Sequence, residues 1–304
     1  MKIVDYLNVT RNILVHPSNR SNPPGALLRA CSQYYKCIIK QKEISIPAFG
    51  HKLYLDPKAD FTRSYIYYTA QKDYHMMNFV KRYLRPGDNF IDVGANIGVY
   101  SLLAASLIGD QGKVYAFEAV PITFSRLQKN ITQNNLSAVI QSWNLAVADK
   151  PSTLEFTVSQ DATNHVLGLN NKTTKRANNQ TLNTVIVQAQ RLDDILSCKQ
   201  DYAMAKIDVE GYELYALKGA ENLIQQKKLP VLMLEINNSF KRYGYSQDDI
   251  HSLLKAFGYE SATYNAESNT LTFTHDVWDD VLFVSSEHKQ NIQKRTKCHI
   301  EQKY

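Results

Sequence analysis

Acidic and amide side chains stand at or near the C-terminal ends of several short apolar runs in this sequence. Asp92 stands inside the first of these runs, just before Gly94. Four later runs end in the same way, at Glu118, at Asn144, at Asp208 with Glu210, and at Glu235 with Asn237. A buried carboxylate is costly unless a cation or hydrogen-bond donors meet it. We therefore expect these side chains to surround a polar ligand at one edge of a sheet.

The segment from Asp92 to Gly98 has the glycine spacing of a nucleoside-binding turn. Gly94 allows a sharp turn after a strand, and Gly98 lets a helix begin close to a ligand or to the strand. The spacing D-x-G-x-x-x-G, with Asn96 inside it, differs from the G-x-G-x-x-G of dinucleotide sites, and no Walker Lys-Ser/Thr follows. The loop favours a nucleoside cofactor without pyrophosphate, such as S-adenosylmethionine; a purely structural turn is the alternative.

Such a cofactor assigns roles to the strand ends. Glu118 ends the second predicted strand, where an acid accepts hydrogen bonds from ribose hydroxyls. Asn144 and Ala146 follow the third strand and are expected near the adenine. Asp92 is expected near the amino end of the methionine, while Gly94, Asn96 and Gly98 shape the loop.

Methyl transfer from a sulfonium requires a donor and an acceptor in line, and a hydroxyl acceptor must lose its proton. Asp208 and Glu210 are the first candidates for the base, although helix capping is an alternative role for both. His165, in the polar segment 159–181, is a further candidate, with an ordinary surface position as the alternative. We expect this segment to be a lid or a disordered insertion.

A divalent metal is a second way to activate the acceptor. Asp208, Glu235 and Asn237 resemble the ligand layout of catechol-type methyltransferases. In this chain, however, Ile236 separates two residues whose counterparts are adjacent in that family.

Alternating strand and helix patterns predict an α/β fold with a doubly wound, mostly parallel, seven-stranded Rossmann-like sheet. We expect an N-terminal extension or lid over residues 1–85, a catalytic domain over 86–285 and a basic tail over 286–304. Within the extension, Asn22-Pro23-Pro24-Gly25 predicts a turn, and residues 44–55 predict a hairpin. Residues 259–264, 270–274 and 281–284 are expected to complete the sheet with antiparallel strands.

The composition is that of a globular protein, with 44% hydrophobic and 21% charged residues among 304. No apolar run reaches the length of a membrane span, and the four cysteines have no metal-ligand spacing, so we expect a cytoplasmic protein. The net charge of +6 is concentrated in the arms: residues 1–52 hold eight Lys and Arg residues against Asp5 and Glu43. We expect no nucleic-acid partner. Solvated ends or contact with an acidic surface would explain the basic arms.

Together these motifs resemble the FkbM family of S-adenosylmethionine-dependent methyltransferases. The resemblance covers roughly residues 85–285 and is most specific over 206–213; Ala119 stands where the family commonly has proline. It implies O-methylation of a hydroxyl on a sugar, glycan or secondary metabolite, with acceptor specificity in residues 1–85 and 159–181. An NAD-dependent oxidoreductase and a non-catalytic cofactor-binding protein are the alternatives.

Overall fold

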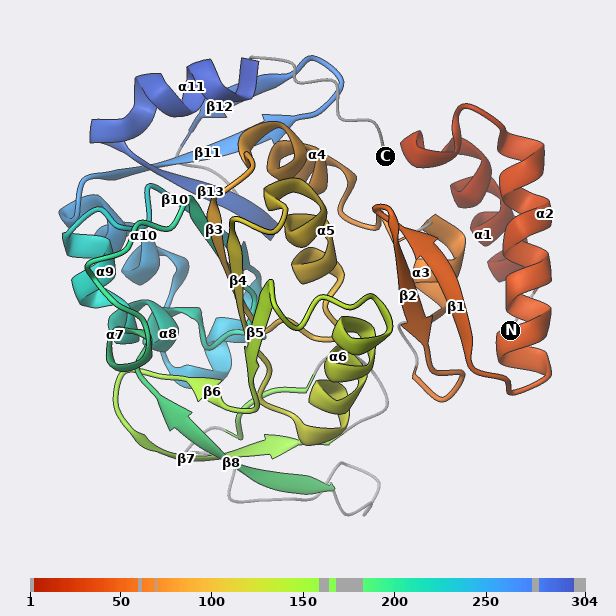
Figure 1. Cartoon of the computed structure of the whole chain (residues 1–304), viewed down its shortest axis with the longest axis horizontal. Coiled ribbons are helices and arrows are strands. Elements are labelled where there is room, and N and C mark those ends of the chain that lie inside the picture. Colours follow the sequence, from red (N-terminus) through yellow and green to blue (C-terminus); the bar gives the residue numbers. More distant parts are fainter. Residues whose placement is uncertain are drawn as a thin grey trace.

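A central eight-stranded sheet with helices on both faces forms the body of the protein (Figure 1). The computed structural model describes residues 3–59, 62–68, 70–158, 164–167, 183–274 and 279–297. In spatial order the strands are β12 (Thr270–Phe273), β11 (Tyr259–Asn265), β13 (Asp279–Ser285), β10 (Val231–Ile236), β9 (Met204–Ile207), β3 (Asn89–Val93), β4 (Lys113–Phe117) and β5 (Ile140–Trp143).

The pairing confirms the predicted fold class. Strands β5, β4, β3, β9 and β10 run parallel, whereas β13, β11 and β12 join antiparallel, with β12 as an eighth strand at the edge. The chain leaves β3 toward β4 and later returns on the other side of β3 to form β9. Ligands of doubly wound sheets bind beyond the carboxyl ends of the strands, at such a reversal of strand order.

Two hydrophobic cores lie on the two faces of the sheet. Side chains alternate along β3, so that Phe90 joins one core while Ile91 and Val93 join the other. The first core includes α4 (Tyr74–Tyr83), α5 (Val99–Ile108) and α6 (Pro121–Gln133). The second includes α7 (Leu192–Ile195), α8 (Glu213–Gly219), α9 (Glu221–Gln225) and α10 (Gln247–Ala256). Asp92 therefore shares the face of Phe90, beneath α5.

A small second sheet lies beyond β5. It has the order β6 (Ala146–Val147), β8 (Thr184–Gln190) and β7 (Ser152–Thr157). Residue Val166 bridges to Phe156 of β7. Most of the predicted lid, residues 159–163 and 168–181, lies outside the described residues.

The N-terminal extension is mainly helical. It contains α1 (Ile3–Val15), η1 (Pro17–Asn19), α2 (Pro23–Tyr34), the π-helical turn η2 (Tyr35–Ile39), β1 (Ile44–Ala48), β2 (His51–Leu55) and α3 (Thr62–Tyr68). The predicted hairpin is confirmed as the antiparallel pair β1–β2. The predicted turn at Asn22 is wrong, because Asn22 caps a helix: its side chain accepts a hydrogen bond from the Gly25 N–H at 3.0 Å. Proline fits the first helical turn, where no backbone donor is needed.

The C-terminal segment is anchored to the body. After η3 (Asn238–Tyr243) and the last strands, η4 (Ser286–His288) leads into α11 (Lys289–Lys297), which packs against α4. Arg295 of α11 pairs with Asp88 and donates to the Tyr83 carbonyl at 2.6 Å. Among the described helices, none has both the length and the apolar character needed to cross a bilayer.

Candidate active site

A cavity opens at the carboxyl ends of β3, β4, β9 and β10, where the strand order reverses. Its lining brings together eight of the twelve residues predicted from the sequence: Asp92, Gly94, Asn96, Glu118, Ala146, Asp208, Glu210 and Glu235. The other four do not line it: Gly98, Asn144, His165 and Asn237.

Gly94 allows two strand ends to meet at the floor of the cavity. Its φ is +77°, and a Cβ at this position would lie 1.8 Å from the backbone oxygen of Asp208. The N–H groups of Gly94 and Ala95 both donate to the Phe117 carbonyl at 2.9 Å, which ties the turn to β4. Gly98 has a different role: a Cβ there would meet Leu127 of α6 at 2.6 Å, so this glycine permits helix packing.

The carboxylate of Glu118 is fixed by the backbone around it. Its two oxygens accept from the N–H groups of Asn96 and Val120, both at 2.9 Å. Burial raises the pKa of Glu118 to about 7, although these two hydrogen bonds oppose the shift. Asn144 supports this loop from outside the cavity, because its amide donates to the carbonyls of Glu118 and Ala119 at 2.9 and 2.8 Å.

Two non-glycine residues of the cavity have a left-handed backbone. Asn96 has a φ of +52° and Glu210 a φ of +55°. This region costs energy for residues with a side chain and persists where the surrounding structure imposes it. The Asn96 side chain accepts from the Ile97 N–H at 2.8 Å, which holds the loop in this form.

A buried lysine of β9 lies beside Asp92 of β3, and it was not predicted as a site residue. Strand register places Lys206 beside Asp92, and its ammonium donates to Asp208 at 2.8 Å. Burial alone would lower the pKa of Lys206, but Asp208 and Asp92 raise it above its ordinary value. The spacing offered the signal, because Lys206 stands two residues before Asp208 and thus faces the same side of the sheet.

Asp92 is buried with one oxygen satisfied. The Ser101 hydroxyl donates to its Oδ2 at 2.6 Å, whereas its Oδ1 has no partner among the described residues. Burial raises the pKa of Asp92, and the neighbouring Lys206 charge opposes that shift. An orphaned buried oxygen in a cavity wall is suited to accept a hydrogen bond from a ligand.

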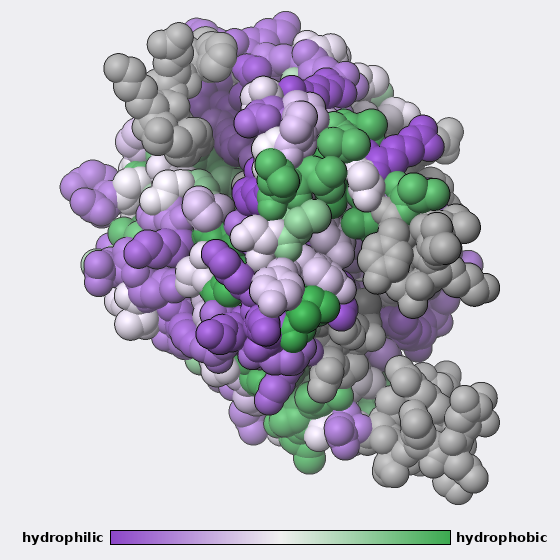
Figure 2. Space-filling model, turned by 90° about the vertical axis from the view of Figure 1, so that its right-hand side faces the viewer, coloured by the Kyte–Doolittle hydropathy of each residue, from purple (hydrophilic) through white to green (hydrophobic). Residues whose placement is uncertain are grey.

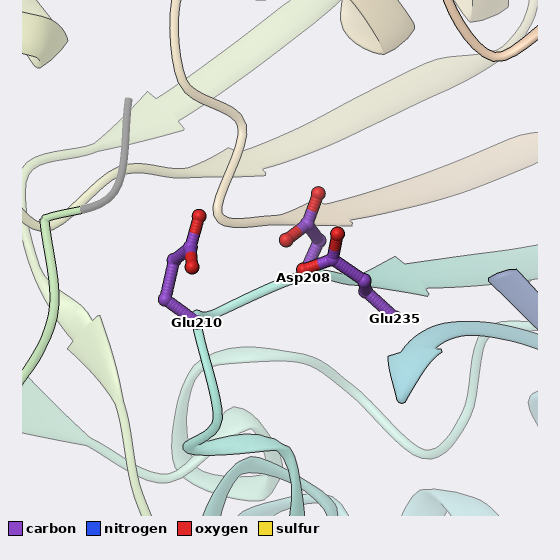
Figure 3. A group of neighbouring side chains, drawn as sticks. All are labelled: Asp208, Glu210 and Glu235. Carbon is purple, nitrogen blue, oxygen red and sulfur yellow. The ribbon is translucent and has the colours of Figure 1, made fainter. Parts of the chain in front are cut away.

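Three carboxyl groups converge at the ends of β9 and β10 (Figure 3). One oxygen from each of Asp208, Glu210 and Glu235 lies within 4.8 Å of the others. Burial and the nearby Asp208 charge raise the pKa of Glu210 to about 7. Burial, Asp208 and Glu210 raise that of Glu235 to about 9. For Asp208, burial would raise the pKa, but the Lys206 charge lowers it below its ordinary value.

Asn237 and His165 lie outside this group. The Asn237 amide donates to Glu235 at 2.9 Å, and its oxygen caps η3 through the Ser239 N–H at 2.8 Å. Glu210 thus occupies the third position that the metal hypothesis gave to Asn237. His165 lies 3.4 Å from the Thr157 hydroxyl; its neighbours Asn164 and Val166 line the cavity, but His165 does not.

The N-terminal extension completes the cavity. Tyr65 of α3, Met77 of α4, and Lys72 and Asp73 between these helices all line it. The Tyr100 hydroxyl of α5 donates to Asp73 at 3.4 Å. We predicted acceptor specificity in residues 1–85 and 159–181 without naming these side chains, because no spacing along the chain signals that they line the cavity.

Asn130 of α6 connects the glycine loop to the extension. Its buried amide donates to the Ile97 carbonyl at 2.8 Å, and its oxygen accepts from the Tyr54 N–H of β2 at 2.7 Å. A single side chain thus bonds to the backbone of both segments.

An open α/β sheet with a cavity at its switch point belongs to the doubly wound class of folds, whose ligands bind at that place. The sequence profile of the methyltransferase FkbM domain matches residues 92–261, and the chain belongs to this family.

Curated relatives match parts of the chain. The 31-O-demethyl-FK506 methyltransferase FkbM of Streptomyces tacrolimicus is 30% identical over 163 residues, which are 46% of this chain and 62% of that protein. Methyltransferase 1 of Beauveria bassiana (strain ARSEF 2860) is 29% identical over 152 residues, 45% of this chain and 60% of that protein. The chain thus spans about 60% of the length of these relatives.

A crystal structure of methyltransferase FkbM from Methylobacillus flagellatus KT aligns with 74% of this chain and 55% of its own, at 17% identity and a TM-score of 0.43.

Proposed function

We propose that the protein transfers the methyl group of S-adenosylmethionine to a hydroxyl group. The observation that carries this proposal is the cavity at the switch point. A nucleoside half around Glu118 and a carboxylate half around Asp208, Glu210 and Glu235 meet there, within the matched family domain. The first half suits a cofactor without phosphate, and the second suits removal of a proton.

In the cofactor half, Glu118 accepts hydrogen bonds from the ribose hydroxyls, and Ala146 borders the adenine. Gly94 and Asn96 shape the loop. The unpartnered Oδ1 of Asp92 accepts a hydrogen bond from the amino group of the methionine. The Asn96 and Val120 N–H groups already hold Glu118 at 2.9 Å, so the ribose meets a preorganised acceptor.

In the reaction, an acceptor oxygen attacks the methyl carbon in line with the sulfur. The new O–CH3 bond forms as the C–S bond breaks, and the electron pair of that bond leaves sulfur neutral. Glu210 takes the proton of the acceptor hydroxyl. A base works best when its pKa lies near the working pH, which favours Glu210, at about 7, over the ion-paired Asp208.

We propose a sugar, glycan or secondary-metabolite hydroxyl as the acceptor. The name of the Streptomyces relative describes methylation at an oxygen of such a metabolite. Tyr65, Lys72 and Asp73 add an aromatic ring and two charged groups to the cavity wall, which suit a polyhydroxylated ligand. Residues 1–85 then act as the acceptor-binding part of the protein.

Calorimetry tests the cofactor. S-Adenosylhomocysteine is expected to bind and NAD to leave no heat; binding of NAD alone would overturn the proposal in favour of an oxidoreductase. Transfer of labelled methyl groups to glycan and metabolite fractions then identifies the acceptor. Cofactor binding with no transfer to any fraction would support a non-catalytic binding protein.

The three converging carboxyl groups also favour a second mode of activation. Oxygen ligands from Asp208, Glu210 and Glu235 suit a hard divalent cation such as Mg²⁺. The cation would have to displace the proton that Glu235 retains below pH 9, so its affinity should rise with pH. Full activity in EDTA would exclude this mode, whereas loss of activity with recovery on adding Mg²⁺ would establish it.

A further inference from the structure

The outer face of the N-terminal helices exposes apolar side chains that the protein's own core does not use. Seven large apolar residues are exposed among the described residues, and five of them lie within residues 7–39: Leu7, Val15, Leu28, Tyr35 and Ile39. We call these five the outer stripe. Figure 2 faces the side of the molecule that carries α1 and α2, and hydrophobic side chains gather there among hydrophilic ones.

Helix geometry separates the outer stripe from the buried face. Ala26 and Ala30 of α2 are buried in the core, whereas Leu28 is 73% exposed. Tyr35 lies seven residues after Leu28, and Ile39 lies four residues after Tyr35. At this helical spacing all three side chains share one face. The helical segment formed by α2 and η2 is therefore apolar on two sides, and one of those sides faces outward.

Cations border the outer stripe. Lys36, Lys40 and Lys42 lie in or just after η2 and are exposed, and the Lys40 ammonium lies 5.4 Å from the centre of the Tyr35 ring. Two described carboxylates near the stripe have other partners: Glu43 pairs with Lys129 at 2.8 Å, and Glu267 with Arg20 at 2.7 Å. The stripe is thus an apolar surface with a positive border.

The positive charge around the outer stripe favours one kind of partner surface over another. A second copy of the chain would bring like charges together around the same residues. A bilayer with anionic headgroups offers opposite charge around an apolar interior, and amphipathic basic helices lie in such an interface. We propose that the outer stripe docks on an anionic lipid surface, with α1 and α2 in the interface and the sheet in water. This inference does not rest on the proposed function.

Vesicle sedimentation tests the docking with the full chain. Vesicles of phosphatidylcholine with about 30% phosphatidylglycerol are expected to bind the protein at low salt, and vesicles of phosphatidylcholine alone to bind it at least tenfold less. Raising NaCl to about 0.5 M should release it, because exposed charges are then screened.

Two triple variants separate the apolar and charged contributions. Leu28→Ser, Tyr35→Ser and Ile39→Ser together should weaken binding by more than about tenfold, since each buries apolar surface in the interface. Lys36→Gln, Lys40→Gln and Lys42→Gln together should do the same. The control combines Ile122→Ser and Ile186→Ser, which are 50% and 73% exposed but lie elsewhere, and should bind as the unmodified chain does.

Three outcomes would overturn the proposal. They are no binding to anionic vesicles, equal weakening by the control, or a dimer in light scattering that the apolar variant abolishes. Melting curves verify that each variant is folded. If the apolar variant does not fold, the lysine variant decides, because its three side chains are exposed.

Discussion

The backbone around the glycine loop holds Glu118 with two N–H groups, whereas at the ends of β9 and β10 three carboxyl groups face one another, and the Lys206 ammonium pairs with only one of them, Asp208. Partners already in place fix the geometry of the first half. In the second half, crowding and burial raise the pKa values of Glu210 and Glu235. One cavity thus combines a rigid half suited to binding with an electrostatically unfavourable half suited to proton transfer.

The largest expected effect is a loss of stability on substituting Gly94, where the two halves of the cavity meet. Gly94→Ala places a Cβ 1.8 Å from the Asp208 oxygen and should lower the free energy of unfolding by more than about 4 kcal/mol. Gly50→Ala is the matched control, because Gly50 has the same φ of +77° but open space around it. Its cost should be about 1–2 kcal/mol. Urea unfolding measures both, and equal costs would show that the contact with β9 is unimportant.

The next effect separates turnover from binding. Glu210→Gln should lower kcat by about 10²–10⁴-fold and leave S-adenosylhomocysteine affinity nearly unchanged, because only the proton acceptor is lost. Glu221→Gln, in α9 and outside the cavity lining, serves as the control. The kcat of the unmodified enzyme should rise as pH increases through about 7, since the base acts when ionised. A Glu210→Gln variant with normal turnover would place the base elsewhere.

A smaller effect is expected in the rigid half. Glu118→Gln presents an amide NH2 where the carboxylate accepts from either the Asn96 or the Val120 N–H. Cofactor affinity should fall by about 10–100-fold, equivalent to roughly 1.4–3 kcal/mol. Calorimetry with S-adenosylhomocysteine measures it. Unchanged affinity would remove Glu118 from the cofactor site.

The smallest expected effect is a pH-dependent change in stability that comes from Glu235. Unfolding lets Glu235 return to its ordinary pKa, so between pH 4.5 and about 9 the unfolded chain has released a proton that the folded chain keeps. Stability therefore falls as pH rises through this window. Glu235→Gln should raise the melting temperature by a few degrees at pH 8 and give no gain below pH 4.5. A gain independent of pH would contradict the assigned cause.

Buried apolar runs made the sheet predictable, because strands such as β3 and β10 are covered on both faces and are mostly hydrophobic, apart from Asn89, Asp92 and Glu235. Strand ends likewise pointed to Asp92, Glu118 and Asp208. The sequence does not reveal contacts between distant segments. Asn144 follows its strand as predicted, but its amide donates to two backbone carbonyls and does not line the cavity. The position of Lys206 beside Asp92 depends on strand register.

The extension was harder to predict for a different reason. The Pro-Pro-Gly sequence after Asn22 suits either a turn or the first turn of a helix, and only the following residues packed in the core decide between them. Its cavity residues, such as Tyr65, line the same cavity as the glycine loop although they are distant from it in the sequence, so no spacing along the chain reveals their role.

The hydrogen bonds of Asn130 constrain how segments of this protein can be exchanged with those of its relatives. Because Asn130 bonds to both Ile97 and Tyr54, the glycine loop and the β1–β2 hairpin are not independent modules. A chimera that imports another N-terminal segment must bring a backbone donor to the position of the Tyr54 N–H, or leave a buried amide oxygen one donor short. Substitutions in the two segments should therefore be epistatic, and exchanges of the N-terminal segment should be tolerated best where the hairpin itself is retained.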